Sequence, residues 1–195
     1  DRRPDAPALA DGVAPGQDRL GFMLPNTPLH HLLLDAVGQP IVLTSGNVSG
    51  APQATGNAEA RQGLAGLAEA FLMHDREVSV RLDDSVAHIV SGAPSILRRA
   101  RGHAPDGIAL PPGFDGSTQV LAMGAELKNT FAFLRHGVAA LSHHIGDLEN
   151  ADTFADYRRA IDHYRDLFGF RPERIVVDHH PDYASTQWGE RLAEE

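Results

Sequence analysis

An apolar run that ends in a glycine-rich polar loop is the feature that most limits what this chain can fold into. Ile41-Val42-Leu43 leads directly into Ser45-Gly46-Asn47-Val48-Ser49-Gly50. The run predicts a buried strand at 41–44, and the loop places backbone amides and short polar side chains where phosphate or carboxylate oxygens can approach closely. A Gly/Ser/Asn cluster is also the composition of a plain turn, so the surrounding sequence has to decide between a binding loop and a turn.

Composition limits the class of protein. The 195 residues are 42% apolar, enough for one or two ordinary cores, and no stretch approaches the roughly 18 apolar residues of a membrane span. No signal peptide is visible, so we expect a soluble cytoplasmic protein without membrane contacts. The absence of cysteine excludes disulfides, thiolate nucleophiles and cysteine zinc sites.

Charge is unevenly distributed along the chain. The formal net charge of −9 argues against a general nucleic-acid surface. Three arginines nevertheless gather within four positions, at Arg98, Arg99 and Arg101. Local recognition of an anion therefore remains open.

Short helical and extended patterns alternate in the first half. Thr27 predicts the cap of a helix that starts at Pro28 and ends at Gly38. A second helix is expected at 58–70. Further strands are expected at 71–73, 78–81, 86–90 and 95–98. The pattern indicates an α/β or α+β layer.

A proline- and glycine-rich stretch at 102–118 predicts a domain connector. After it the sequence predicts strands at 120–123, 130–134, 138–142 and 175–177, with a turn at His136-Gly137. Apolar residues at helical spacing predict a long helix at 151–168, and a final helix is expected at 183–193.

Seven short motifs follow one another along the chain. They are residues 23–33 (MLPNTPLHHLL), 44–50 (TSGNVSG), 74–76 (HDR), 83–86 (DDSV), 98–102 (RRARG), 124–130 (GAELKNT) and 144–150 (HIGDLEN). Together they resemble the HypF carbamoyltransferases of nickel-iron hydrogenase maturation. They occur in the family's order over nearly the whole chain, which makes the resemblance more specific than any single motif.

The resemblance implies a two-domain α/β (α+β) architecture. Residues 1–107 resemble the later part of a YrdC-like domain, a twisted mixed sheet with helices. Residues 108–118 form the linker, and residues 119–195 resemble the start of a Kae1-like domain with the actin/hsp70-type ATPase fold. If opening strands of the first sheet are missing, its exposed edge can swap, dimerise or aggregate.

The resemblance also implies an activity and its partners. In the family, ATP and carbamoyl phosphate yield a carbamoyl-adenylate, whose carbamoyl group passes to the C-terminal cysteine of HypE and ends as a cyanide ligand on iron. The family's acylphosphatase domain, zinc fingers, histidine-rich metal motif and upstream lysine/arginine motif do not occur in this sequence. We therefore expect an excised fragment that is inactive alone, with the zinc and metal sites outside it, and we assign no catalytic residue.

A first nucleotide site follows from the same resemblance. Ser45, Asn47 and Ser49 would contact the nucleotide and the carbamoyl group, with Ser85 and Arg98 on the phosphate side. Adenylate chemistry needs such donors, because stabilising the developing negative charge is usually the largest catalytic term. Ser85 can instead bond to its own turn and the arginines can be solvated surface, but guanidinium matches phosphate geometry.

Metal binding is less well supported by the sequence. Asp83 and Asp84 could hold Mg²⁺ beside the phosphates of ATP, since this ion prefers carboxylate oxygens. Neighbouring strand residues point to opposite faces, so we favour a structural role in which one aspartate pairs with Arg76 or Arg81. The histidine pairs 30–31, 143–144 and 179–180 lack the i,i+4 spacing of a helical ligand pair, so we expect no complete metal site.

A second nucleotide site is expected at Lys128 and Asn129. They stand in a glycine-started loop between two strands, where actin-like ATPases hold phosphates, and an exposed loop lysine is the alternative. Asp147 and Asp178 could orient metal-bound water or a nucleotide, or they can act as capping and turn aspartates.

Other functions stay open. YrdC-type proteins make threonylcarbamoyl-adenylate for tRNA modification, but they usually carry arginine two residues before the proline matched by Pro25, where this chain has Met23. Antibiotic O-carbamoyltransferases share the same domain pair. A non-catalytic nucleotide- or RNA-binding module is the third class, and the acidic net charge disfavours RNA.

Overall fold

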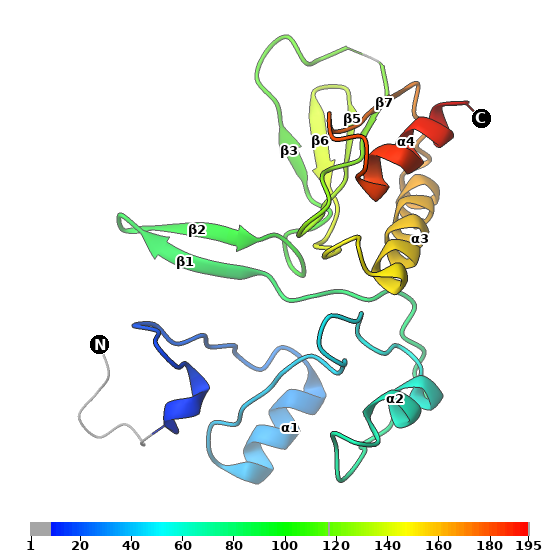
Figure 1. Cartoon of the computed structure of the whole chain (residues 1–195). Coiled ribbons are helices and arrows are strands. Elements are labelled where there is room, and N and C mark those ends of the chain that lie inside the picture. Colours follow the sequence, from blue (N-terminus) through cyan, green and yellow to red (C-terminus); the bar gives the residue numbers. More distant parts are fainter. Residues whose placement is uncertain (1–8, 117, 195) are drawn as a thin grey trace. The chain divides into compact units, whose positions relative to one another are not determined.

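The computed structural model describes residues 9–116 and 118–194, which fall into two compact units, Asp1–Ser45 and Gly46–Glu195. Both helices and strands are present, as Figure 1 shows, and this confirms the expected α/β class. The domain boundary expected at 108–118 is a different division and stays a prediction. No helix within the two described ranges is long and apolar enough to cross a membrane.

The first unit contains the short 3₁₀ helix η1 (Asp11–Val13) and helix α1 (Pro28–Val37). The Thr27 hydroxyl accepts a 3.2 Å hydrogen bond from the His30 amide, and Pro28 fits the first turn because its missing N–H would be unpaired there. Gly38 ends α1 in the left-handed conformation. This helix is as predicted.

Three predicted strands are not strands. Residues 41–44, 71–73 and 78–81 pair with no other strand among the described residues, and Val42 and Leu72 are 75% and 76% exposed. An apolar run becomes a strand only where a neighbouring backbone supplies its hydrogen bonds. The predictions at these three places were wrong because none of these segments has a partner strand among the described residues. A local sequence pattern does not show whether such a partner exists.

The second unit begins with the loop 46–56 and helix α2 (Asn57–Leu64). The predicted helix at 58–70 was too long, since α2 stops before Gly66. Gly63 lies in the last turn of α2 and Gly66 follows it, and glycine weakens a helix interior by about 0.5–1 kcal/mol relative to alanine.

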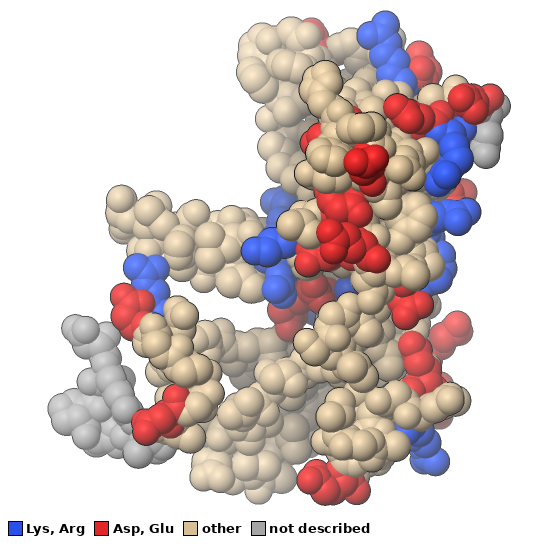
Figure 2. All heavy atoms as spheres, viewed as in Figure 1, with Lys and Arg blue, Asp and Glu red and all other residues tan. Residues whose placement is uncertain are grey.

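Strands β1 (Val86–Val90) and β2 (Ala93–Arg98) form an antiparallel hairpin, as predicted. Ser91 and Gly92 both have positive φ, which matches the tight turn that twisted strands prefer. Residues 86–97 contain no Lys, Arg, Asp or Glu, and in Figure 2 the hairpin is uncharged up to its base. Ile89 and Leu97 are 63% and 64% exposed, so the hairpin presents apolar surface.

A mixed five-stranded sheet, in the order β3-β6-β5-β4-β7, organises the rest of this unit. Neighbouring strands are antiparallel except β4 and β7, which are parallel. The strands are β3 (Gly107–Ala109), β4 (Val120–Ala122), β5 (Ala132–Arg135), β6 (Val138–Leu141) and β7 (Arg174–Val176). Strand β3 lies within the stretch predicted to be a connector, so that prediction missed a sheet edge.

The core lies between this sheet and helices α3 (Ala151–Phe168) and α4 (Ala184–Glu194). Asn150 caps α3 and Gly169 ends it, so its bounds match the predicted ones. The ring of Phe131 contacts Phe133, Tyr157 and Tyr164 edge to face. This core holds the loops after β4 and β6 in place.

Candidate functional site

The loop 46–54 is closed by its own hydrogen bonds. The Ala54 amide donates to the Gly46 carbonyl at 3.1 Å, and Asn47 Nδ2 donates to the carbonyls of Val48 and Ala51 at 3.0 and 2.9 Å. Because both hydrogens of Nδ2 are used, Asn47 can offer its Oδ1 to a ligand as an acceptor. The sequence predicts a hydrogen-bond donor at this position, whereas the group that Asn47 leaves free is an acceptor.

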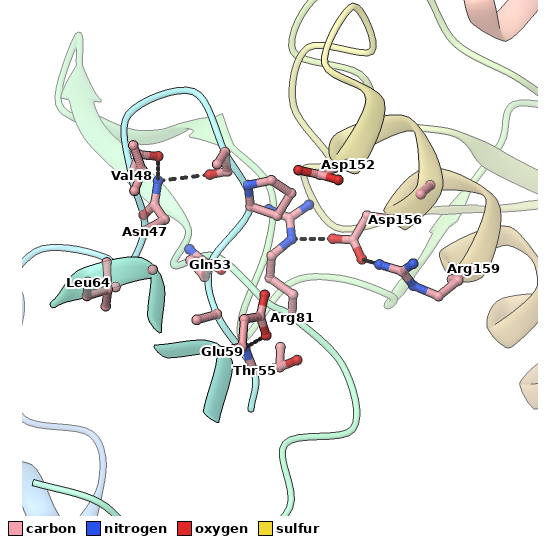
Figure 3. A pocket seen from close by; sticks show the side chains of 16 residues that line it. Asn47, Val48, Gln53, Thr55, Glu59, Leu64, Arg81, Asp152, Asp156 and Arg159 are labelled. Atoms are coloured by element: carbon pink, nitrogen blue, oxygen red, sulfur yellow. Dashed lines mark hydrogen bonds and ion pairs between the residues drawn. The ribbon is translucent and has the colours of Figure 1, made fainter. Parts of the chain in front are cut away.

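Asn47 lines a pocket of about 360 Å³ (Figure 3). The loop and α2 form one wall, and the first half of α3 forms the other. Polar and charged side chains dominate the lining: Asn47, Gln53, Thr55, Glu59, Arg81, Asp152, Asp156 and Arg159. The pocket can therefore hold a polar ligand, but its carboxylates disfavour a bare phosphate unless the arginines turn toward it.

Arg81 crosses this pocket. Its side chain is only 8% exposed, and it donates to Asp156 Oδ2 at 2.5 Å and to the Ile145 carbonyl at 2.8 Å. Asp156 also pairs with Arg159 at 2.7 Å. Asp156 thus neutralises one of the two arginine charges, and the three side chains together keep one positive charge (Figure 3).

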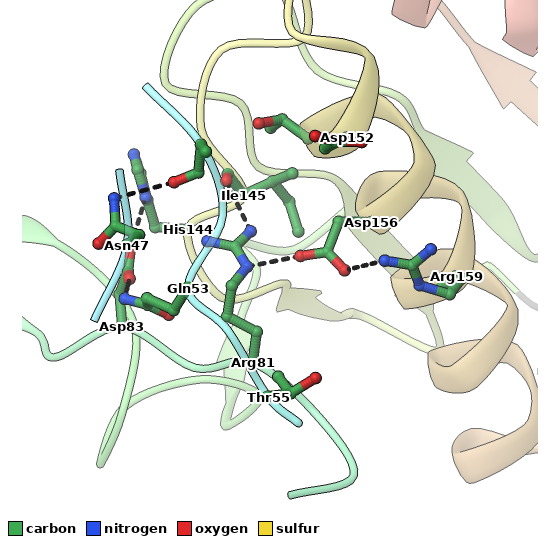
Figure 4. A network of polar contacts seen from close by, with 12 residues as sticks. Asn47, Gln53, Thr55, Arg81, Asp83, His144, Ile145, Asp152, Asp156 and Arg159 are labelled. Carbon is green, nitrogen blue, oxygen red and sulfur yellow. Dashed lines mark hydrogen bonds and ion pairs between the residues drawn. The ribbon is translucent and has the colours of Figure 1, made fainter. Parts of the chain in front are cut away.

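Asp83 is the centre of a second group of contacts, shown in Figure 4. It accepts hydrogen bonds from Gln53 Nε2 at 2.5 Å and from His144 Nδ1 at 2.9 Å, and Arg98 Nη1 lies 4.0 Å away. Burial alone would raise the pKa of Asp83, but the hydrogen bonds from His144 and Gln53, together with the charges of Arg81 and His144, outweigh it and hold this pKa below its ordinary value. The carboxylate is charged at neutral pH.

The two neighbouring aspartates have structural partners, though different ones from those expected. Asp84 pairs with Arg101 at 2.9 Å, and Asp83 has the partners described above. Arg81 instead reaches Asp156, so the expected pairing of Asp83 or Asp84 with Arg76 or Arg81 was wrong. The reason is that α3, distant in sequence, brings a carboxylate closer. Within 9–116 and 118–194 no cluster of His, Asp and Glu could hold a metal ion.

Arg98 differs from its two arginine neighbours. Arg99 donates to the Asp106 carbonyl, and Arg101 donates to both Asp84 and the Leu82 carbonyl. Arg98 has a 42% exposed side chain and the long 4.0 Å pairing with Asp83. It is the guanidinium of the three with most freedom to meet an anion.

The five residues expected at the first site do not gather in one cavity. Asn47 lines the pocket, whereas Ser49, Ser85 and Arg98 do not belong to its described lining, and Ser45 is the last residue of the first unit. The Ser85 hydroxyl donates to the Arg101 carbonyl and accepts from the Ala100 amide, both at 2.9 Å. The hydroxyl proton of Ser85 is therefore engaged within the fold, as expected if this residue has a structural role instead of contacting a ligand. Gln53 and Asp83 connect the pocket to Arg98.

The loop of the expected second site is tightly built. Lys128 is exposed with a positive φ, and its amide donates to Asp147 Oδ1 at 2.6 Å. Asn129 is 2% exposed, and its Nδ2 donates to the carbonyls of Met123 and Ala125. Asp178 accepts from the His180 amide in a turn. Lys128 is therefore open to a ligand, while Asn129 shapes the loop.

Sequence reasoning missed Gln53, Asp156 and Glu126. Glu126 is buried and accepts a 2.8 Å bond from the Ala184 amide at the start of α4, where a carboxylate complements the helix dipole. Asp156 sits on the face of α3 that carries the pocket. Polar residues at helical spacing read as solvated surface, so only the fold reveals these roles.

Two sequence models match consecutive parts of the chain. The Sua5/YciO/YrdC family model, described as telomere recombination, matches residues 2–100, and the HypF Kae1-like domain matches residues 115–195.

Known proteins match over nearly the whole chain. The carbamoyltransferase HypF of Rhodobacter capsulatus is 48% identical over 93% of this chain, and that of Synechocystis sp. is 45% identical over 95%. The chain spans 24% of the length of each. Full-length HypF in its phosphate- and nucleotide-bound crystal form has a TM-score of 0.88 at 43% identity, covering 94% of this chain and 29% of that one. HypF of T. kodakarensis has a TM-score of 0.87 at 33% identity, covering 96% and 24%.

Proposed function

Because this chain belongs to the HypF carbamoyltransferase family, we propose that it supplies part of a carbamoyltransferase of hydrogenase maturation. One observation carries this proposal: the chain matches a YrdC-type model and a HypF Kae1-like model in succession, at residues 2–100 and 115–195. These ranges support domains at 1–107 and 119–195 joined by a linker at 108–118, although strand β3 reaches into that linker.

In the proposed reaction, water releases phosphate from carbamoyl phosphate, and the resulting carbamate attacks the α-phosphorus of ATP to give carbamoyl-adenylate and pyrophosphate. The C-terminal cysteine thiol of HypE then takes the carbamoyl group and releases AMP. Mg²⁺ would accompany ATP as its counterion. The reaction belongs in the cytoplasm, where ATP is present, and the cysteine-free sequence agrees with that compartment. Because the chain spans 24% of its relatives' length, we propose that it is inactive without the remaining domains.

The first site is proposed at Ser45, Asn47, Ser49, Ser85 and Arg98. Asn47 supports it through the free Oδ1, which can accept from the carbamoyl NH₂ or from a ribose hydroxyl. Arg98 supports it because its side chain is 42% exposed and its ion pair with Asp83 is long, at 4.0 Å. The contribution of Ser85 is indirect, through the backbone at 100–101. The second nucleotide site is proposed at Lys128, with Asn129 holding the loop.

Calorimetric titration with ATP and AMP tests the first site. We expect Asn47→Ala and Arg98→Ala to lower the affinity about tenfold each, since each removes one polar contact. Arg191→Ala, an exposed arginine in the last turn of α4, is the charge-matched control. Equal affinity in all four proteins rejects the assignment.

A second candidate is threonylcarbamoyl-adenylate synthesis, favoured by the YrdC-type match alone. A labelling experiment separates the two. A protein of the relatives' full length that carries this segment is incubated with labelled carbamoyl phosphate, ATP, HypE and threonine. Label on the HypE cysteine supports the hydrogenase function, and label on threonine removes it.

A further inference from the structure

Two side chains of one three-residue stretch, Arg81 and Asp83, reach from the YrdC-like part of the second unit to its Kae1-like part. We propose that they are positioning residues, which fix the Asn47 pocket relative to the Lys128 loop. This inference rests on the proposed function for its catalytic consequence. Its geometric part, that these two contacts hold residues 46–101 against residues 119–194, stands independently.

Arg81 makes the first connection. Its guanidinium bonds at once to a carboxylate of α3 and to the carbonyl of Ile145, which is itself 2% exposed in the core. An exposed ion pair contributes little, but a side chain that is 8% exposed and held by two acceptors is costly to release. Losing it leaves the half-buried Asp156 with only its exposed neighbour Arg159.

Asp83 makes the second connection. One carboxylate oxygen accepts from Gln53 of the pocket wall, and the other accepts from His144 of the Kae1-like part (Figure 4). Asp83 is 13% exposed, so water competes weakly for these bonds.

The connection continues to the second site through the backbone. His144 is followed by Ile145, whose amide donates to the Asn129 carbonyl at 2.9 Å, and the Asn129 amide donates to the Gly146 carbonyl at 2.8 Å. Asn129 is the neighbour of Lys128. An unbroken series of bonds thus runs from the pocket wall, through Gln53, Asp83 and His144, to the loop of the second site.

This series of bonds matters for a reaction that uses two sites. A reactive intermediate made at one site must meet the second site at a set distance, and interfaces within a chain allow relative motion unless specific contacts restrain it. An error of about 1 Å in placement can cost about a hundredfold in rate. Contacts that fix the distance therefore affect transfer more than they affect formation of the adenylate.

Distance measurement by electron spin resonance tests the geometric part. The chain has no cysteine, so Ala58→Cys on α2 and Glu190→Cys on α4 introduce the only two labelling sites. We expect Arg81→Met and Asp83→Asn to roughly double the width of the distance distribution. Arg81→Lys keeps the charge but not both bonds, so an intermediate width is expected.

Each of the two residues has a matched control variant. Arg159→Met removes an arginine from the same Asp156 without touching residue 81, and Asp84→Asn removes an aspartate that pairs within its own segment. Both should keep the parental width. Unchanged widths in Arg81→Met, Arg81→Lys and Asp83→Asn overturn the proposal, whatever the nucleotide affinity.

The catalytic part is tested in a full-length carbamoyltransferase that carries this segment. With Arg81→Lys and Asp83→Asn we expect transfer to HypE to fall at least about tenfold further than pyrophosphate release from ATP, because misplacement of the second site affects transfer more than formation of the adenylate. An equal fall in both steps overturns the positioning role. If the parent itself releases no pyrophosphate, the proposed function fails and the distance result remains.

Discussion

Gln53 and Asp83 are joined by a 2.5 Å hydrogen bond although thirty positions separate them in the sequence. Gln53 lines the pocket that contains Asn47, and Asp83 lies 4.0 Å from Arg98. The Gln53–Asp83 bond therefore links Asn47 and Arg98, the two residues that the sequence predicts to share a cavity. They belong to one network rather than to one wall.

The first prediction follows from that bond. Gln53→Ala removes a donor from a largely buried carboxylate, so we expect the free energy of unfolding to fall by about 1–3 kcal/mol and the affinity for AMP to fall with it. Chemical unfolding and calorimetric titration measure the two effects. Gln62→Ala, on the exposed face of α2, is the control and should change neither. If both variants behave alike, the bond does not support the loop.

Gly124 gives a prediction about the loop of the second site. A Cβ placed there would lie 2.2 Å from the Thr130 carbonyl oxygen and 2.8 Å from Asn129 Nδ2, and φ is +71°. Backbone cannot move aside cheaply, so Gly124→Ala should destabilise the chain by about 2–4 kcal/mol in thermal or chemical unfolding. Gly66→Ala, with open space around it, should be nearly neutral. A neutral Gly124→Ala contradicts the close approach described here.

His143 predicts how stability depends on pH. Burial, with help from Arg81, lowers the pKa of His143 from 6.5 to about 4. As the pH falls, the imidazole of His143 therefore binds a proton near pH 6.5 in the unfolded chain but only near pH 4 in the folded chain. Stability from this group is complete above pH 6.5 and decreases by about 3 kcal/mol as the pH falls to 4.

Unfolding curves at several pH values between 4 and 7 check this dependence. His143→Gln should flatten it, whereas His103→Gln, at an exposed position, should leave it unchanged. The lowered pKa of Asp83 acts in the same direction but at lower pH, since its ordinary value is 3.8. A slope that persists in His143→Gln assigns the effect to another group.

The apolar hairpin predicts self-association. Ile89 and Leu97 are more than half exposed on strands that carry no charge before Arg98. We expect Ile89→Lys together with Leu97→Lys to lower light scattering at high concentration without changing the helix signal. Leu127→Lys alters a residue of similar exposure, 62%, in a loop and serves as the control. Equal scattering from all three proteins places the association elsewhere.

Local patterns sufficed for the elements whose determinants are local. The cap Thr27 and the stop at Gly38 predicted α1, apolar residues at helical spacing predicted α3, and the β1–β2 hairpin follows from its own tight turn. Strand β3 and the missing strand at 41–44 depend on partners distant in sequence, which periodicity does not show. The family resemblance, carried by motif order, was confirmed by the two domain matches.

The candidate site was less predictable than the fold. Residue types named the loop and the arginines, but which hydrogens of Asn47 and Ser85 remain free depends on neighbours that the fold supplies. Gln53 and Asp156 carry no motif at all. Their role depends on where the fold places them, and a single sequence does not show this.

Strand β3 has a practical consequence for separating the two halves. Its residues 107–109 hydrogen-bond to 138–140 at the edge of the five-stranded sheet, although they stand before the segment that looks like a flexible joint. A cut after Ala109 would remove an edge strand from the C-terminal half and leave β6 uncovered. Isolating that half intact therefore requires cleavage upstream of Gly107, in the short stretch that follows Arg101.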